Sequence, residues 1–197
     1  MEKSNRGILL AAPVAMAALL LGLVAPGTAL LGTQTTTESV GPHGYVIVTV
    51  TRHGNEIYRN EDHNLITDAG KDFISVQIGQ TTGIGSNGAN FIALSTNTAS
   101  PVAGDTALAG EITNGGLSRS QGAYAHTNGQ NTFTITEQFT ASATHTAVLK
   151  AGLFTAAVTG TPGAGGDDGI MMAENTFSAV TLQDGDQLTI TWTITLS

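Results

Sequence analysis

The most regular pattern of hydrophobic and polar positions lies at the end of the sequence, in residues 187–196. Every second position there is apolar, and the positions between them are mostly Thr. Side chains of a β-strand point alternately to its two faces, so this alternation predicts a strand with one buried face. The residues expected in the core are Leu188, Ile190, Trp192, Ile194 and Leu196.

Shorter patterns of the same kind, separated by Gly, Asn and Asp, predict further strands. We expect them at residues 45–52, 56–60, 91–94, 117–125, 132–140, 144–156 and 170–180. The additional core residues expected from these strands are Phe133, Ile135, Phe139 and Phe177. One short helix should follow Thr67, whose hydroxyl suits an N-cap. Short strands between turns predict an all-β fold, a jelly-roll or immunoglobulin-like β-sandwich over residues 45–197.

Residues 1–29 have a different pattern, in which Lys3 and Arg6 precede an uncharged stretch at residues 7–24. Small residues follow, so the segment is typical of a secretory signal cleaved after Ala29. The apolar stretch is also near the lower length limit for an uncleaved membrane anchor. Arg6 and the next residues further resemble the processing site of archaeal type IV pilins, in which the apolar helix builds a filament core. All three alternatives predict an extracellular or cell-surface domain, with possible membrane contact through residues 8–24.

Residues 30–44 predict a linker that is either a flexible stalk or an arm that adds a β-strand to another subunit. Pro42 has no amide hydrogen, so strand pairing should break there. The residues expected in this assembly arm are Thr33, Thr35, Thr36, Thr37, Val40, Tyr45, Val46, Ile47, Val48 and Val50. The alternative is that residues 45–52 pair within their own chain.

Composition supports the β fold and narrows the classes of function. The sequence has 25 Gly and only 11% charged residues, against a usual share of about 25%. Its net charge of −8 has the wrong sign for binding phosphates, so nucleic acid is not an expected partner. The chain has no Cys, which excludes disulfides, thiolate catalysis and Cys-based zinc sites.

Candidate catalytic and metal-binding residues form no recognised pattern. No Ser, His and acid are spaced as a catalytic set, so we expect neither an enzyme nor a cofactor. Paired carboxylates in Gly-rich loops could offer oxygen ligands to Ca²⁺; they are Asp167 with Asp168, and Asp184 with Asp186. The second pair is more typical of a hairpin turn. Arg is scarce in this chain, and Arg119 falls in an expected strand. We therefore expect Arg119 to form a packed, structural ion pair with Glu111.

The order of several motifs is also informative. These motifs occupy residues 64–70, 91–95, 115–119, 151–154 and 185–192. Their order resembles that of small β-sandwich structural proteins found in phage tails and among secreted proteins of prokaryotes, archaea included. The layout of signal, short arm and Thr/Gly-rich domain is also similar to archaeal threads and bundling pili, whose β-domain accepts an N-terminal strand from its neighbour.

The resemblance implies a non-enzymatic structural subunit of an extracellular filament, such as a pilus or thread, or of a virion. Its partners would be copies of itself, joined into a homopolymer by β-strand addition. The alternative from another class is a membrane-anchored surface adhesin or ligand-binding β-sandwich. A secreted hydrolase is a third and weaker hypothesis.

Overall fold

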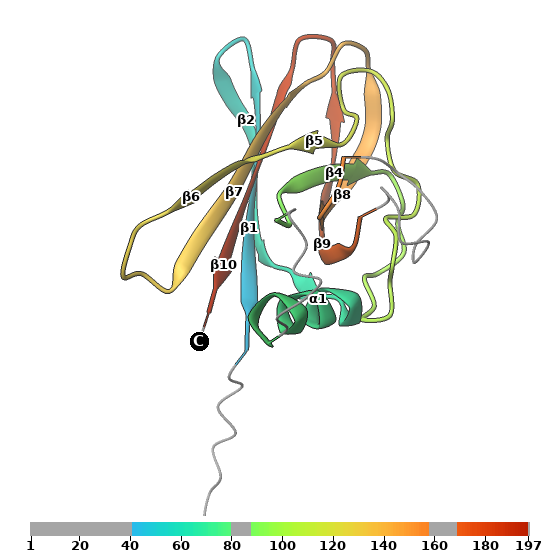
Figure 1. The fold of residues 1–197 in the computed structure, drawn as a ribbon. Helices are drawn as coiled ribbons and strands as arrows, with labels where there is room; N and C mark the ends of the chain where they lie inside the picture. Colours follow the sequence, from blue (N-terminus) through green and yellow to red (C-terminus); the bar gives the residue numbers. More distant parts are fainter. Residues whose placement is uncertain (1–40, 80–87, 158–168, 197) are drawn as a thin grey trace, which may run out of the picture. The chain divides into compact units, whose positions relative to one another are not determined.

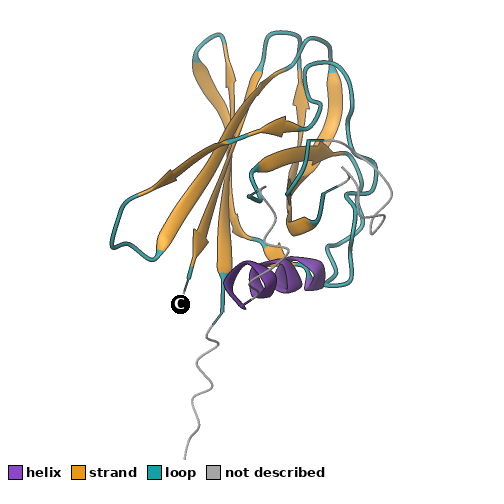
Figure 2. Ribbon diagram, in the orientation of Figure 1, coloured by secondary structure: helices purple, strands orange, loops and turns teal. Residues whose placement is uncertain are grey.

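A computed structural model describes residues 41–79, 88–157 and 169–196. The chain divides into two units, Met1–Glu38 and Ser39–Ser197, and all described residues belong to the second. This second unit consists mainly of β-strands in two antiparallel sheets, with one short helix (Figure 2). The expected leader at residues 1–29 and most of the expected linker at residues 30–44 lie outside the described residues.

The two sheets have five strands each, and every pairing is antiparallel (Figure 1). The first sheet has the order β2-β1-β10-β7-β6. Its strands are β1 (His43–Arg52), β2 (Asn55–His63), β6 (Ala123–His126), β7 (Thr132–Thr140) and β10 (Gln187–Thr195). The second sheet has the order β3-β9-β8-β4-β5. Its strands are β3 (Leu65–Ile66), β4 (Phe91–Ser95), β5 (Ser120–Gln121), β8 (His145–Phe154) and β9 (Met171–Leu182).

The main hydrophobic core lies between the two sheets, which makes the unit an all-β sandwich. One cluster of buried side chains joins Val46, Val48 and Val50 of β1 with Ile92 and Leu153 of the second sheet. The alternating residues of β10 belong to the same cluster, and Leu188, Ile190, Trp192 and Ile194 have no exposed surface. Ile135, Phe139 and Phe177 are buried as well, and Phe133 is half-buried against the cluster.

The core assignment of Leu196 was wrong. Strand β10 ends at Thr195, which pairs with His43 at the start of β1. Leu196 lies one residue beyond this pairing, and 52% of its surface is exposed. The alternation in the sequence therefore continues past the point where the second sheet covers the first.

Helix α1 (Asp68–Gly79) begins where the N-cap pattern predicts. The hydroxyl oxygen of Thr67 accepts a hydrogen bond of 2.9 Å from the backbone N–H of Gly70, which satisfies a free donor of the first turn. Gly70 is required for packing, because a Cβ there would lie 2.1 Å from the backbone oxygen of Met172. The absence of a side chain thus lets the first turn of α1 rest directly on β9.

The single strand expected at residues 117–125 is instead two short strands in different sheets. β5 pairs with β4 of the second sheet, and β6 pairs with β7 of the first. The chain crosses between the sheets at Gly122, whose N–H donates to Asn90 O at 2.7 Å. A Cβ on Gly122 would lie 2.7 Å from a methyl carbon of Ile135, so this close crossing needs glycine.

Part of the segment at residues 96–119 covers the outer face of the second sheet, whereas its Ile112 and Leu117 belong to the main core. Leu108 of this loop packs with Ala93, Phe154 and Met171 in a second, smaller hydrophobic cluster. Strands β8 and β9 are consequently buried on both faces along much of their length.

Candidate functional site

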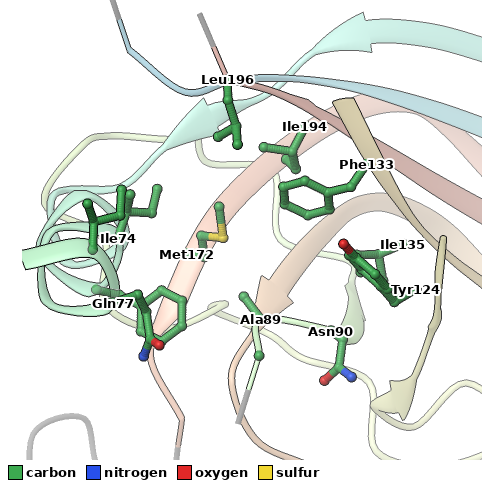
Figure 3. Close-up of a pocket in the computed structure, with 13 residues that line it drawn as sticks. Ile74, Gln77, Ala89, Asn90, Tyr124, Phe133, Ile135, Met172, Ile194 and Leu196 are labelled. Atoms are coloured by element: carbon green, nitrogen blue, oxygen red, sulfur yellow. The ribbon is translucent and has the colours of Figure 1, made fainter. Parts of the chain in front are cut away.

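An apolar groove opens between α1 and the inner face of the first sheet (Figure 3). Its volume is about 370 Å³. Its floor includes the buried side chains of Met172, Ile135 and Ile194. The remaining lining residues are Phe73, Ile74, Gln77, Ile78, Gly88, Ala89, Asn90, Tyr124, Phe133 and Leu196. The groove therefore presents mainly hydrocarbon and aromatic surface.

Three large hydrophobic residues at the groove are substantially exposed. They are Ile78 at 81%, Tyr124 at 61% and Leu196 at 52%. Tyr124 pairs with Ile135, so it continues the inner face of the first sheet beyond the part that the described second sheet covers. Its ring also packs against Phe133, with the ring centres 5.7 Å apart. Exposed apolar residues gathered in one place are typical of an interaction surface.

Strand β6 forms one edge of the first sheet and borders this groove. It pairs with β7 on one side, and all four of its residues are exposed. Within the described part of the chain, no strand pairs with its other side. An open edge of this kind can accept a strand from another chain.

The structure separates the two halves of the expected assembly arm. Thr33, Thr35, Thr36, Thr37 and Val40 lie outside the described residues. Tyr45, Val46, Ile47, Val48 and Val50 belong to β1, which pairs with β10 on one side and β2 on the other. Assigning residues 45–50 to a donated arm was wrong, because both edges of this strand are already hydrogen-bonded and its valines fill the chain's own core.

Glu111 and Arg119 form the ion pair that the sequence suggests. Arg119 Nε and Nη2 donate to the two carboxylate oxygens of Glu111 at 3.0 and 2.7 Å. The guanidinium carbon also lies 3.6 Å from the centre of the Phe154 ring, a cation–π arrangement. Arg119 precedes β5 and is not itself in a strand. Its contacts hold the loop over the outer face of the second sheet.

Asp186 has a structural partner. Arg52 Nε and Nη2 donate to its two oxygens at 2.8 and 2.6 Å. The hydrogen bond from Arg52 is the main reason that the pKa of Asp186 lies below its ordinary value. Asp184 is exposed in the turn before β10, where Gly185 has a φ of +84°.

The candidate calcium ligands therefore do not converge on an ion in the part that the structure describes. Asp167 and Asp168 lie outside the described residues. Among residues 41–79, 88–157 and 169–196, no group of three His, Asp or Glu side chains is placed to hold a metal ion.

Lys150 and Glu174 form a second buried ion pair, which the sequence patterns did not predict. Lys150 Nζ lies 2.5 Å from Glu174 Oε1, and the two side chains are 3% and 2% exposed. Burial is the main cause that raises the pKa of Glu174, and the contact with Lys150 opposes it. The available signal was a lone Lys in the apolar run Val148–Ala151, a position where an unpaired charge is costly.

No protein-family model, curated protein or solved structure matches this chain. Among the described residues, no helix is long and apolar enough to cross a membrane. The apolar residues 8–24 lie outside the described residues.

Proposed function

We propose that the protein is a non-enzymatic structural subunit of an extracellular filament or virion, whose copies join by β-strand addition. The observation that carries this proposal is the apolar groove beside the open edge of β6. An extended segment from a neighbouring copy could pair with this edge and place apolar side chains over Tyr124 and Leu196. Such pairing satisfies backbone hydrogen bonds and removes hydrocarbon surface from water.

The proposed donor is the segment at residues 33–40 of another copy. Its Thr and Val residues favour extended structure, and it precedes β1 without being part of it. One copy would then give its segment to the next and receive a segment from the previous one. Because donor and acceptor surfaces differ, this contact forms fibres unless its rotation closes a ring.

Extracellular location belongs to the same proposal. The support is the basic residues and uncharged stretch at the N-terminus, a pattern typical of export signals. The net charge of −8 favours a partner other than nucleic acid.

We also propose that the sandwich is closer to a jelly roll than to an immunoglobulin fold. The support is the strand order, in which the first strand, β1, pairs with the last, β10. β10 lies in the middle of its sheet, whereas the last strand of an immunoglobulin constant domain lies at a sheet edge.

Assembly by the purified, secreted chain tests this function, with negative-stain microscopy and sedimentation as measurements. Tyr124→Asp should abolish polymers, because it places a charge at both the groove and the β6 edge. Ile57→Asp is the matched control, since Ile57 is 47% exposed on β2, at the opposite edge of the same sheet. Deletion of residues 30–40 should also abolish polymers.

Several results would contradict the proposal. Monomers of the unmodified chain at all concentrations would reject the filament function. Polymers that survive Tyr124→Asp but not Ile57→Asp would move the contact to β2. Polymers that survive the deletion would exclude residues 33–40 as the donor.

A surface adhesin or ligand-binding module is the second candidate function. The observation that favours it is the groove volume of about 370 Å³, which falls within the usual range for small-molecule sites, about 300–1,000 Å³. A monomeric chain that binds an apolar fluorescent probe, and loses that binding in Tyr124→Asp, would favour this function over the first.

A further inference from the structure

An amine and a carboxyl group, those of Lys150 and Glu174, lie buried together on the outer face of the second sheet. Lys150 lies on β8 opposite Thr176 of β9, and Glu174 is two residues away on β9. Residues spaced in this way point to the same face and are diagonal neighbours. Lys150 Nζ and Glu174 Oε1 are 2.5 Å apart, so the amine nitrogen and the carboxyl group are in direct contact.

The loop over this face excludes water and fixes the amine. Lys150 Nζ donates to Ala99 O at 2.7 Å, which holds the end of the side chain against Glu174. The side chains of Lys150 and Glu174 keep only 3% and 2% of their surface exposed. A buried, oriented pair of this kind gains reactivity because the two groups no longer have to meet by diffusion.

A second carboxyl group completes the arrangement. Asp105 of the covering loop accepts a hydrogen bond from Val102 N at 2.8 Å. Glu174 Oε2 has no donor among the described residues. Burial and, to a smaller degree, the negative charge of Asp105 raise the pKa of Glu174, which favours its protonated form.

We propose that Lys150 and Glu174 condense to an isopeptide bond that links β8 to β9. The Lys150 side chain supplies the nucleophile, the Glu174 carboxyl group supplies the electrophile, and Asp105 transfers protons between them. The cross-link goes beyond assembly, because it forms within one chain and requires no partner.

The reaction balances without any other reagent. A proton first passes from the Lys150 ammonium to the Glu174 carboxylate, which gives a neutral amine beside a neutral acid. The amine lone pair then attacks Glu174 Cδ, and the Nζ–Cδ bond forms while the Cδ–OH bond breaks. Asp105 takes one proton from Nζ and gives one to the departing hydroxyl. One water molecule leaves, and Asp105 returns to its initial state.

The environment favours this product over the ion pair. Burial raises the pKa of Glu174, which favours the neutral acid that can be attacked. An amide carries no net charge, so it avoids the cost of holding two charges away from water. The chain has no Cys, so a disulfide cannot join these strands.

Another Lys–carboxylate pair in the same chain supplies the control. Lys71 Nζ lies 2.9 Å from Asp68 Oδ1 on α1, but the two side chains are 59% and 64% exposed. Water surrounds this pair, so it should remain an ordinary ion pair.

Mass spectrometry of the full chain after denaturation tests the proposal. We expect the unmodified sequence to be lighter than its calculated mass by one water molecule, with any N-terminal cleavage measured on separate peptides. Trypsin cannot cut after a linked Lys150, so a peptide spanning residues 120–197 should persist and carry the loss. Lys150→Arg and Asp105→Asn should restore the missing water, whereas Lys71→Arg should retain the loss.

The deciding measurement is made on the unmodified chain, so it does not depend on whether a variant folds. Separate tryptic peptides for residues 120–150 and 151–197, with no loss of water, would overturn the proposal. Water loss that persists in Lys150→Arg would place the cross-link elsewhere and reject this pair. Water loss that persists in Asp105→Asn would reject the proton-transfer role of Asp105.

Discussion

The two sheets of the sandwich bury their strands in different ways. In the first sheet, β1 and β10 alternate between buried and partly exposed positions, because one face packs in the core and the other meets solvent. In the second sheet, the last seven residues of β8 are all buried, since the loop at residues 96–119 covers the outer face. A long loop can therefore replace a third layer of secondary structure and create a second set of buried positions.

The strongest way to test this difference is to remove the largest side chain between the sheets. Trp192 is fully buried in the core. Trp192→Ala should lower the free energy of unfolding by about 3–5 kcal/mol, measured by urea denaturation. A loss below about 1 kcal/mol would mean that the inner face of β10 is much less tightly packed than its burial indicates.

A smaller loss is expected on the outer face of the second sheet. Leu108 is 4% exposed and belongs to the loop cluster rather than to the inter-sheet core. Leu108→Ala should cost about 2 kcal/mol, at the low end for a buried Leu, because a loop can relax into the cavity. A cost equal to that of Trp192→Ala would show that the loop is as rigid as the sheets.

The ion pair between Arg52, at the end of β1, and Asp186, just before β10, should respond to acid. Arg52 lowers the pKa of Asp186, so its stabilising effect is present above the ordinary Asp pKa, about 3.9, and is lost as pH falls through the folded-state value. Asp186→Asn removes this titrating group, so the free energy of unfolding of the variant should fall less steeply as the pH is lowered. Thermal midpoints measured across the acid range provide the check, and an unchanged acid slope would contradict the assignment.

The smallest effect is expected on the solvent face of the first sheet. Thr136 donates to Thr191 across the strands at 3.2 Å, and both residues are partly exposed. Thr191→Ala should cost about 0.2–1 kcal/mol, the usual value for a cross-strand pair. A cost above about 2 kcal/mol in urea denaturation would mean that this face is covered in solution.

The contrast between the sheets also explains which features the sequence could predict. β10 alternates strictly, and β7 alternates except at Glu137; the expected bounds of both strands differ from the observed ones by no more than a residue. The crossing at Gly122 could not be predicted, because the need for glycine arises from a contact with Ile135, which is distant in sequence. Leu196 was assigned to the core for a related reason, since periodicity says nothing about where the opposite sheet ends.

The candidate site was still harder to infer from sequence. Its lining comes from one helix, four strands of the two sheets and a loop, and no short motif joins Phe73 to Tyr124 or Leu196. The pair of Lys150 and Glu174 also depends on the register between β8 and β9, which brings together residues that are far apart in the sequence. Only the unusual presence of charge inside apolar strands gave a local sign of it.

The antiparallel pairing of β1 with β10 makes mechanical strength depend on direction. His43 faces Thr195, so the two ends of the described domain lie at the same end of this strand pair (Figure 1). A pull between these two ends would unzip the strands one residue pair at a time. A pull from His43 against the opposite end, where Thr51 faces Gln187, would load all of these pairs together in shear. The same domain would thus peel apart easily when held by both ends and resist when tension runs along its strands.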